Sequence, residues 1–241
     1  MNNMRKRLKI NLNDTWLGDA VSLVYPRVCQ SCGKGLLRNE NVICTHCINE
    51  IPRTNFHSYK DNMVAQTFWG RMPVENATSF YYFQQGSLFQ KLIHRLKYLG
   101  KKEIGIEMGK HFASHLLSTP FADTDVIIPV PLHPKKEYKR GYNQSLMIAR
   151  GMGSVFDIPV NTTAVQRLVM SQTQTRKTRI DRWENVSDIF SVGKPEEIKG
   201  KHVLLIDDVL TTGATLEACG AQILKVPDTC LSVATLALSY A

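Results

Sequence analysis

The sequence predicts an α/β domain, built on a mostly parallel sheet flanked by helices, with a small zinc-binding module before it. Short segments that are apolar throughout alternate with segments whose apolar residues recur at helical spacing. Strands that are apolar on both faces are typical of parallel sheets covered by helices. Two closely spaced pairs of cysteines precede this pattern. We therefore expect the module over residues 1–62 and the α/β domain over residues 63–241.

The composition excludes a disordered chain and indicates anionic partners. Of the 241 residues, 43% are hydrophobic and 21% are charged, which suffices for a buried core. The formal net charge is +9, and the basic excess is concentrated in residues 1–10, 133–150 and 166–182. Because clustered basic residues form a binding face, whereas scattered ones only aid solubility, we expect these segments to contact phosphates or other anions.

The sequence also predicts a cytoplasmic protein. Its longest apolar stretches, 126–132 and 231–238, are much shorter than the roughly 18 residues that a membrane-spanning helix needs. The basic start is similar to that of a signal peptide, but Asn11, Asn13 and Asp14 interrupt the apolar stretch that would have to follow.

The cysteine pairs form the pattern C-x2-C-x11-C-x2-C, with the members Cys29, Cys32, Cys44 and Cys47. Two such pairs can supply the four thiolates of a tetrahedral site, so we predict a structural Zn²⁺ there. A redox-active pair is the alternative, although it would need only one C-x2-C. His46 and His57 are near enough in sequence to replace a thiolate, but a solvated histidine is the commoner case. Cys219 and Cys230 are expected to be buried small apolar residues.

The first segments flank the cysteines. Apolar residues recur at helical spacing over 16–24 and end at Pro26, which predicts a helix packed on the body of the protein. A membrane-surface helix is the alternative, which Asp14 and Asp19 disfavour. Residues 51–62 are polar and predict a linker.

Strands and helices then alternate to the end of the sequence. Apolar spacing on one side predicts helices, and runs of β-branched, aromatic or uniformly apolar residues predict strands. The expected strands are 78–83, 125–131, 159–165, 202–206 and 231–238, and the expected helices are 87–98, 108–117, 144–155 and 215–225. Prolines over 129–134 predict a turn after the strand 125–131.

Ligands of such sheets bind beyond the carboxyl ends of the strands, so the segment after 202–206 is the predicted site. It contains Asp207, Asp208, Val209, Leu210, Thr211, Thr212, Gly213, Ala214 and Thr215. The start of a helix and threonine hydroxyls can bind phosphate, and the two carboxylates can accept hydrogen bonds from a diol. Gly213 is expected because a side chain would obstruct the approach of phosphate to the backbone. Together these groups fit ribose 5-phosphate; an ordinary threonine-rich helix cap is the alternative.

These residues resemble the phosphoribosyl pyrophosphate signature of type I phosphoribosyltransferases, which is an apolar strand, two acids and a Thr-Thr-Gly-x-Thr-like loop. From about residue 23 onward, the chain resembles the ComF family, competence-associated proteins with an amino-terminal zinc module and a phosphoribosyltransferase domain. The other matching residues are 26–29, 96–100, 129–134, 139–144, Arg167, Ser171, Gln174, Arg182, Asn185 and Phe190. Ser171 and Lys177 depart from the family pattern, where threonine and leucine are usual.

The resemblance implies a type I phosphoribosyltransferase fold that binds phosphoribosyl pyrophosphate with Mg²⁺. Asp207 and Asp208 would be the catalytic residues that hold the ribose hydroxyls, and residues 209–215 with Arg182 would bind the substrate. Pyrophosphate would be displaced at ribose C1, with catalysis by positioning and charge stabilisation. Residues 171–188 are expected to form a mobile lid, and basic residues of 135–140 are candidates for pyrophosphate binding or for a solvated surface. The acceptor stays open.

A binding protein without turnover is the alternative function. The family association with DNA uptake suggests single-stranded DNA and DNA-uptake proteins as partners, because the basic segments can neutralise phosphates. Trp69, Tyr81, Tyr82 and Phe83 could stack on bases or belong to the core. The basic segments could equally serve pyrophosphate alone or only aid solubility. The sequence predicts no oligomeric state.

Overall fold

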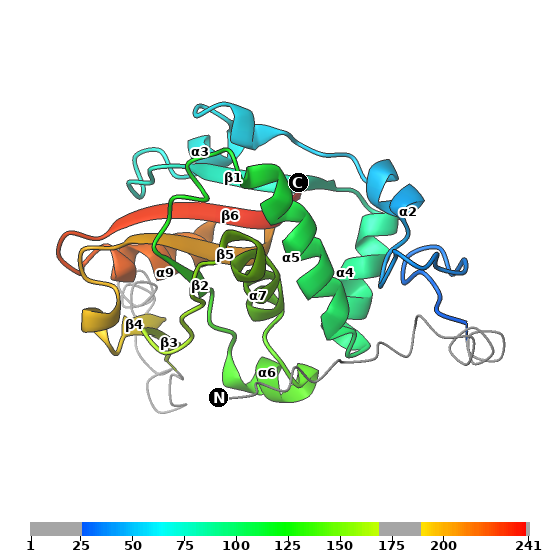
Figure 1. Ribbon diagram of the computed structural model, residues 1–241. Helices are drawn as coiled ribbons and strands as arrows, with labels where there is room; N and C mark the ends of the chain where they lie inside the picture. Colours follow the sequence, from blue (N-terminus) through cyan, green and yellow to red (C-terminus); the bar gives the residue numbers. More distant parts are fainter. Residues whose placement is uncertain (1–25, 169–188, 240–241) are drawn as a thin grey trace, which may run out of the picture.

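A four-stranded parallel sheet forms the centre of the protein, in the computed structural model that describes residues 26–168 and 189–239 (Figure 1). Its strand order is β1-β6-β5-β2. The bounds are Ala77–Phe83 for β1, Val126–Pro129 for β2, His202–Leu210 for β5 and Cys230–Ser239 for β6. The predicted fold class is confirmed. Within the described residues, no helix is long and apolar enough to cross a bilayer.

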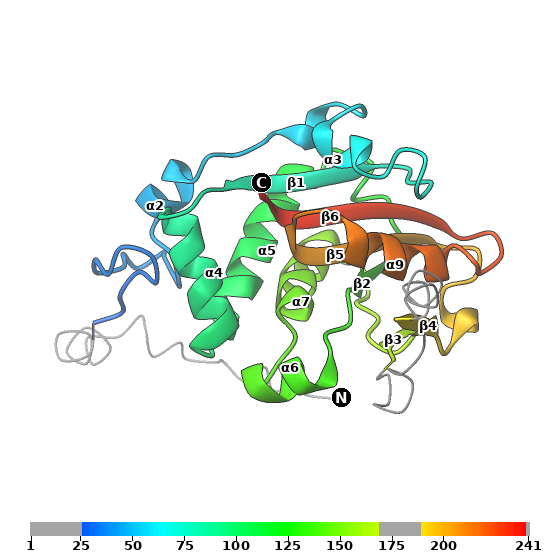
Figure 2. The ribbon, with the colours of Figure 1, turned by 180° about the vertical axis from the view of Figure 1, so that it is seen from behind.

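Helices cover both faces of this sheet, which is why its strands are apolar throughout. On one face, Leu204 and Ile206 of β5 pack in the same cluster as α4 (Leu88–Tyr98), α5 (Lys102–Leu116) and α7 (Gln144–Phe156). On the other face, Val203 and Leu205 pack in a second cluster with α9 (Ala214–Ile223), seen in Figure 2. Alternate side chains of β5 therefore pack into two hydrophobic clusters, one on each face of the sheet.

The close packing of α5 on α7 depends on glycine. A Cβ atom at Gly109 would lie 2.2 Å from the carbonyl oxygen of Ile148, and one at Gly151 would lie 2.1 Å from that of Ile106. Since Cβ atoms do not approach backbone so closely, only glycine allows this contact. The start of α7 lies at the carboxyl edge of the sheet, where Ser145 contacts Asp207 of β5.

Short elements complete the fold. They are α2 (Thr45–Glu50), η2 (Phe56–Ser58), α3 (Met63–Gln66), α6 (Pro134–Arg140), η4 (Pro195–Glu197), and the antiparallel pair of β3 (Val165–Arg167) and β4 (Phe190–Val192). The segment 51–62, expected as a polar linker, instead packs along β1: Thr54 N donates to Phe80 O, and Phe56 is buried.

Several expected elements differ from the structure. The helix expected over 108–117 begins earlier, at Lys102. Most of 159–165 is not a strand, since only Val160 forms a parallel bridge, to Ile127, before β3 begins at Val165. The turn expected over 129–134 leads into a helix, α6, that was not predicted. The helix expected over 16–24 and the lid over 171–188 fall outside the described residues.

Candidate functional site

The residues predicted to bind a ligand lie at the carboxyl edge of the sheet, where β5 passes through Asp207 and Asp208 and ends at Leu210. β5 is longer than expected, so both acids belong to the strand rather than to the loop. Val209 is half-buried and Leu210 is buried, and both belong to the lining of the hollow described below. Thr211, Thr212 and Gly213 connect β5 to α9.

Asp207 is held at this edge by the beginning of α7. Ser145 Oγ donates a hydrogen bond of 2.8 Å to Asp207 Oδ1, and the backbone N–H of Asp208 donates to the same oxygen. Burial, and secondarily the neighbouring Asp208 charge, raise the pKa of Asp207 to about 7. Asp207 is therefore only partly ionised near neutral pH.

Asp208 is paired with a lysine from a different element. Lys97 Nζ, at the end of α4, lies 2.7 Å from Asp208 Oδ2, and both side chains are largely buried. Lys97 belongs to the motif 96–100, so its identity was noted in the sequence. Its contact with Asp208 was not foreseen, and neither was that of Ser145 with Asp207, because both depend on how the helices pack on the sheet.

The connection from β5 to α9 has a backbone that favours glycine. Gly213 has a φ of +78°, in the left-handed region, and forms the N-cap of α9. A Cβ there would also lie 2.8 Å from Thr67 Cγ2 and 3.3 Å from Phe68 Cε1. Packing and backbone conformation thus account for the glycine, in addition to the expected approach of phosphate.

A small hollow lies at this connection and is lined by residues 207 and 209–216. Within the described ranges, the N–H groups of Thr212, Gly213 and Thr215 have no hydrogen-bond acceptor. Such free N–H groups at the start of a helix, with the helix dipole behind them, are suited to an anion. The structure thus brings residues 207–215 together, whereas Arg182 falls outside the described residues.

The loop 129–134 lies beside β5 at the same edge. Val130 N donates to Ile206 O, and Asn143 Nδ2 donates to Val130 O, which fixes the loop to the start of α7. Arg140 donates to Gln144 Oε1 at 2.6 Å and lies over the Tyr98 ring. Its guanidinium therefore supports α6, while Lys135 and Lys136 are exposed and face solvent.

Carboxylates of this kind suit a hard cation such as Mg²⁺. The ammonium of Lys97 already offsets the charge of Asp208, and Asp207 is only partly ionised, so the pair carries little free negative charge. The two acids offer oxygen ligands of the right kind, but Mg²⁺ would have to be held chiefly by oxygens of the ligand that it accompanies.

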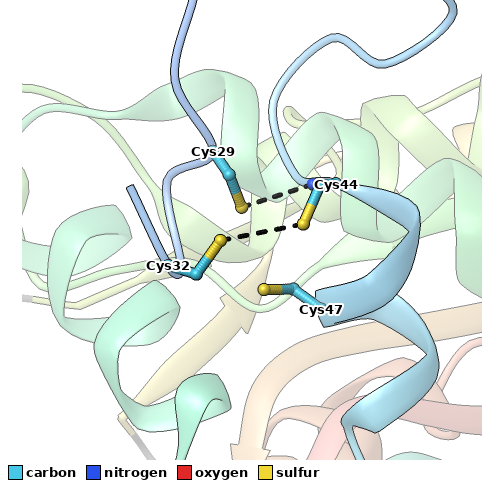
Figure 3. Close-up of side chains that lie close together, drawn as sticks. All are labelled: Cys29, Cys32, Cys44 and Cys47. Atoms are coloured by element: carbon cyan, nitrogen blue, oxygen red, sulfur yellow. Dashed lines mark hydrogen bonds between the residues drawn. The ribbon is translucent and has the colours of Figure 1, made fainter. Parts of the chain in front are cut away.

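The four paired cysteines converge at one point, as Figure 3 shows. Their sulfur atoms all lie within 4.8 Å of one another, and Cys32 Sγ is 3.8 Å from Cys44 Sγ. Four thiolates about 2.3 Å from one tetrahedral Zn²⁺ would be about this far apart. This cluster can hold such a metal.

The backbone around Cys29 favours its thiolate, whereas burial raises the pKa of Cys44 and Cys47. Ser31 N and Cys44 N donate to Cys29 Sγ at 3.4 and 3.3 Å. Burial raises the pKa of Cys29, but these and other backbone hydrogen bonds outweigh burial and lower it to about 6. His46 pairs with Glu50, and neither His46 nor His57 joins the described cluster.

Two other groups of residues were expected from the sequence. Cys219 is fully buried, as expected, whereas Cys230 is only half-buried. Among the aromatic candidates for base stacking, Tyr81 belongs to the core and Trp69 is exposed. Tyr82 and Phe83 are half-buried against the two hydrophobic clusters.

The carboxyl-terminal part of the chain matches a known protein family. The family described as "Phosphoribosyl transferase domain" matches residues 143–239. Among solved structures, a glutamine phosphoribosylpyrophosphate amidotransferase from B. subtilis is 17% identical, with a TM-score of 0.44 over 59% of this chain and 30% of that chain.

Curated relatives extend over more of the chain. Competence protein F of Haemophilus influenzae is 26% identical over 83% of this chain and 85% of its own length. Competence protein ComFC of Bacillus subtilis is 25% identical over 82% of this chain and 72% of its own length. With the parallel sheet, the motif at its carboxyl edge and the cysteine cluster, this similarity supports a protein of the ComF family.

Proposed function

We propose that the protein binds phosphoribosyl pyrophosphate with Mg²⁺ at the carboxyl edge of the sheet and transfers its phosphoribosyl group. The main support is that the Asp207 carboxylate and the free N–H groups at the start of α9 lie beside the same hollow, with Asp208 next to Asp207 in β5. The N–H groups would bind the 5-phosphate, and Asp207 and Asp208 would accept hydrogen bonds from the ribose hydroxyls. The acceptor stays open.

In this reaction, the protein's own residues chiefly position the substrate and neutralise charge. Ser145 orients the Asp207 carboxylate, and Lys97 offsets the charge of Asp208. The loop 129–134 and the lysines of α6 lie where pyrophosphate would leave. Mg²⁺, when bound, would supply charge neutralisation of the pyrophosphate.

Calorimetry tests the binding step. Phosphoribosyl pyrophosphate with Mg²⁺ should bind the wild-type protein, and Asp207→Ala with Asp208→Ala should lose most of the affinity. Lys201→Ala, at the opposite edge of the sheet, is the control. Unchanged affinity in the double variant would place the ligand elsewhere. A separate assay, the release of pyrophosphate in the presence of candidate acceptors, distinguishes an enzyme from a binding protein.

A second candidate function is binding of single-stranded DNA, in line with the names of the competence relatives. The supporting observation is a basic and aromatic surface around α6 and the end of α4. Tyr138 is 93% exposed and Tyr98 is 59% exposed. Lys135, Lys136 and Lys139 are exposed on α6. Aromatic rings among cations are suited to stack on bases along a phosphate backbone.

Salt-dependent titration of an oligonucleotide tests this candidate. The logarithm of the affinity should fall with the logarithm of salt concentration, with a slope of about −0.7 for each phosphate neutralised. Tyr138→Ala should weaken binding without changing the slope, whereas Lys135→Ala with Lys136→Ala should reduce the slope. Absence of binding at low salt would refute this function and leave the transferase proposal intact.

The cysteine cluster is proposed to hold one structural Zn²⁺. Its support is the mutual distance of the four sulfurs and the backbone N–H groups that donate to Cys29. Elemental analysis should find about one zinc per chain. Protein purified under reducing conditions without metal would contradict the proposal.

A further inference from the structure

The segment that follows α3 packs against the connection between β5 and α9. Phe68 is fully buried, and Thr67 and Phe68 leave no space for a side chain at Gly213. This contact joins residues far apart in sequence. The matched phosphoribosyltransferase region, 143–239, does not include Thr67 or Phe68.

Arg71 links the two sides of this contact through hydrogen bonds. Its Nη1 donates to Thr67 O at 3.1 Å and to Thr212 O at 3.2 Å, and its Nη2 donates to the Glu217 carboxylate on α9. Arginine suits such a position because its planar guanidinium presents donors in a fixed arrangement. Glu217 holds the guanidinium in place while Nη1 binds the carbonyl of Thr212.

The bond to Thr212 O restrains the peptide group between Thr212 and Gly213. This peptide is trans, as are the others in the described residues, so its carbonyl and the N–H of Gly213 point in opposite directions. With the carbonyl bound to Arg71, the Gly213 N–H is directed away from the guanidinium and is left free for an anion.

Glycine alone would not secure this orientation. A flip of the peptide would change φ of Gly213, and glycine tolerates both signs of φ at little cost. A flipped peptide would present a carbonyl oxygen to the phosphate in place of an N–H donor. The restraint must therefore come from outside the loop, and Arg71 supplies it.

We propose that Arg71 is a positioning residue, which holds the Thr212–Gly213 peptide in the orientation that binds the 5-phosphate of the ligand. This inference rests on the proposed function, since it assumes that phosphate binds at the start of α9. It adds a residue from the amino-terminal part of the chain to the phosphate-binding loop between β5 and α9.

The experiment compares ribose 5-phosphate with inorganic pyrophosphate as probes in the presence of Mg²⁺. Arg71→Ala should weaken ribose 5-phosphate binding about tenfold, the loss of roughly one hydrogen bond to a charged group. Binding of pyrophosphate should be unchanged, because pyrophosphate is expected at the loop 129–134. Glu217→Gln, which keeps a weaker acceptor for Arg71, should show a smaller loss than Arg71→Ala.

Chemical rescue and a matched control separate positioning from stability. Millimolar guanidinium ion, which can occupy the space left in Arg71→Ala, should restore part of the ribose 5-phosphate affinity. Lys194→Ala, which removes an ion pair with Glu197 of similar exposure at the other edge of the sheet, should leave both affinities unchanged. Unchanged ribose 5-phosphate binding in Arg71→Ala, or equal loss of both probes without rescue, would overturn the inference.

The failure of the proposed function has a different signature. In that case ribose 5-phosphate would not bind the wild-type protein, or Asp207→Ala with Asp208→Ala would bind it normally. If the double variant loses binding while Arg71→Ala retains it, the site is correct and only the role of Arg71 is wrong.

Discussion

Asp207 and Asp208 are neighbours in one strand, yet their surroundings give them different properties. Asp208 has a lysine against it, whereas Asp207 has only neutral donors, a serine hydroxyl and a backbone N–H. Burial and the adjacent carboxylate therefore raise the pKa of Asp207 to about 7. A carboxyl group kept partly protonated in this way costs folding free energy when it ionises.

This difference predicts opposite effects of two similar substitutions on stability. The unfolded protein loses the Asp207 proton near its ordinary pKa of 3.8, and the folded protein loses it only near 7. The contribution of Asp207 to the free energy of unfolding is therefore greatest at acid pH and decreases as the pH rises to about 7. Asp207→Asn should be more stable than wild type above pH 7, with the advantage vanishing in acid, as measured by thermal unfolding. Asp208→Asn, which leaves Lys97 unpaired, should be less stable.

The two acids and the threonine-rich loop could be predicted because they are contiguous in sequence and form a recognisable motif. Lys97, Ser145 and Arg71 could not, because each comes from a different element. Their distances from the motif are set by helix packing. Gly213 shows the limit of a local argument, since its contact with Thr67 could not be known before the fold.

At the scale of secondary-structure elements, the errors in the predicted strands and helices have local causes. The segment 159–165 is rich in β-branched residues, but Asn161 Oδ1 accepts from the N–H groups of Thr163 and Ala164 and closes a turn there. α6 was not predicted because the prolines over 129–134 indicated a turn. Pro134 in fact occupies the first turn of the helix, where proline is tolerated, His133 caps the start and Gly141 ends the helix. Helices α4, α7 and α9 were predicted because their apolar spacing is regular.

The close contact between α5 and α7 predicts that a side chain added at one of its glycines will destabilise the protein. Gly151→Ala would ordinarily gain up to about 1 kcal/mol in a helix, but its Cβ would overlap the Ile106 carbonyl oxygen. Overpacking of this kind costs about 1–3 kcal/mol, so the net change should be a loss. Denaturant unfolding should show a lower midpoint. Gly193→Ala, where the nearest atom is a flexible glutamine side chain 3.4 Å away, should be nearly neutral.

The segment before β1 is attached to α5 by a cluster that is sensitive to acid. Arg53 donates to His115 Nε2 at 3.0 Å and to His111 Nε2 at 3.4 Å. Burial, then the charges of His115 and Arg53, lower the pKa of His111 to about 4. His57 faces the same cluster, and burial and His115 lower its pKa as well.

Stability should therefore fall as pH drops from about 6.5 to about 4, because the unfolded chain takes up the His111 proton first. His111→Gln keeps an acceptor for Arg53 but cannot titrate in this range. Its unfolding midpoint should depend less on pH than that of wild type. Equal pH dependence in the two proteins would contradict this origin of the acid sensitivity.

At the scale of the whole molecule, the cysteine cluster and the α/β part share one core. Cys29, Cys44 and Cys47 belong to the same hydrophobic cluster as Phe89 and Leu92 of α4. The sequence located the cysteine module and the α/β part but could not indicate this shared core. Its division at residue 62 stays a prediction.

The shared core predicts that loss of the proposed zinc affects the entire protein. Cys44→Ser should lose the metal and lower the temperature of the main unfolding transition, because metal binding is coupled to folding. Cys230→Ser, outside the cluster, should retain the metal. Calorimetric scanning with elemental analysis measures both. A Cys44→Ser protein with a separate early transition and an unchanged main one would show two independent units.

The pairing of β1 with β6 has a consequence for biosynthesis. Ser79 of β1 and Thr235 of β6 are partners in the sheet although they are 156 residues apart in the chain. During translation β1 leaves the ribosome long before its partner, so the aromatic side chains of Phe80 and Tyr81 lack that neighbour until β6 has been made. Such non-local pairing slows folding and leaves hydrophobic surface exposed, which favours aggregation. The nascent chain is therefore expected to depend on chaperones until β6 emerges.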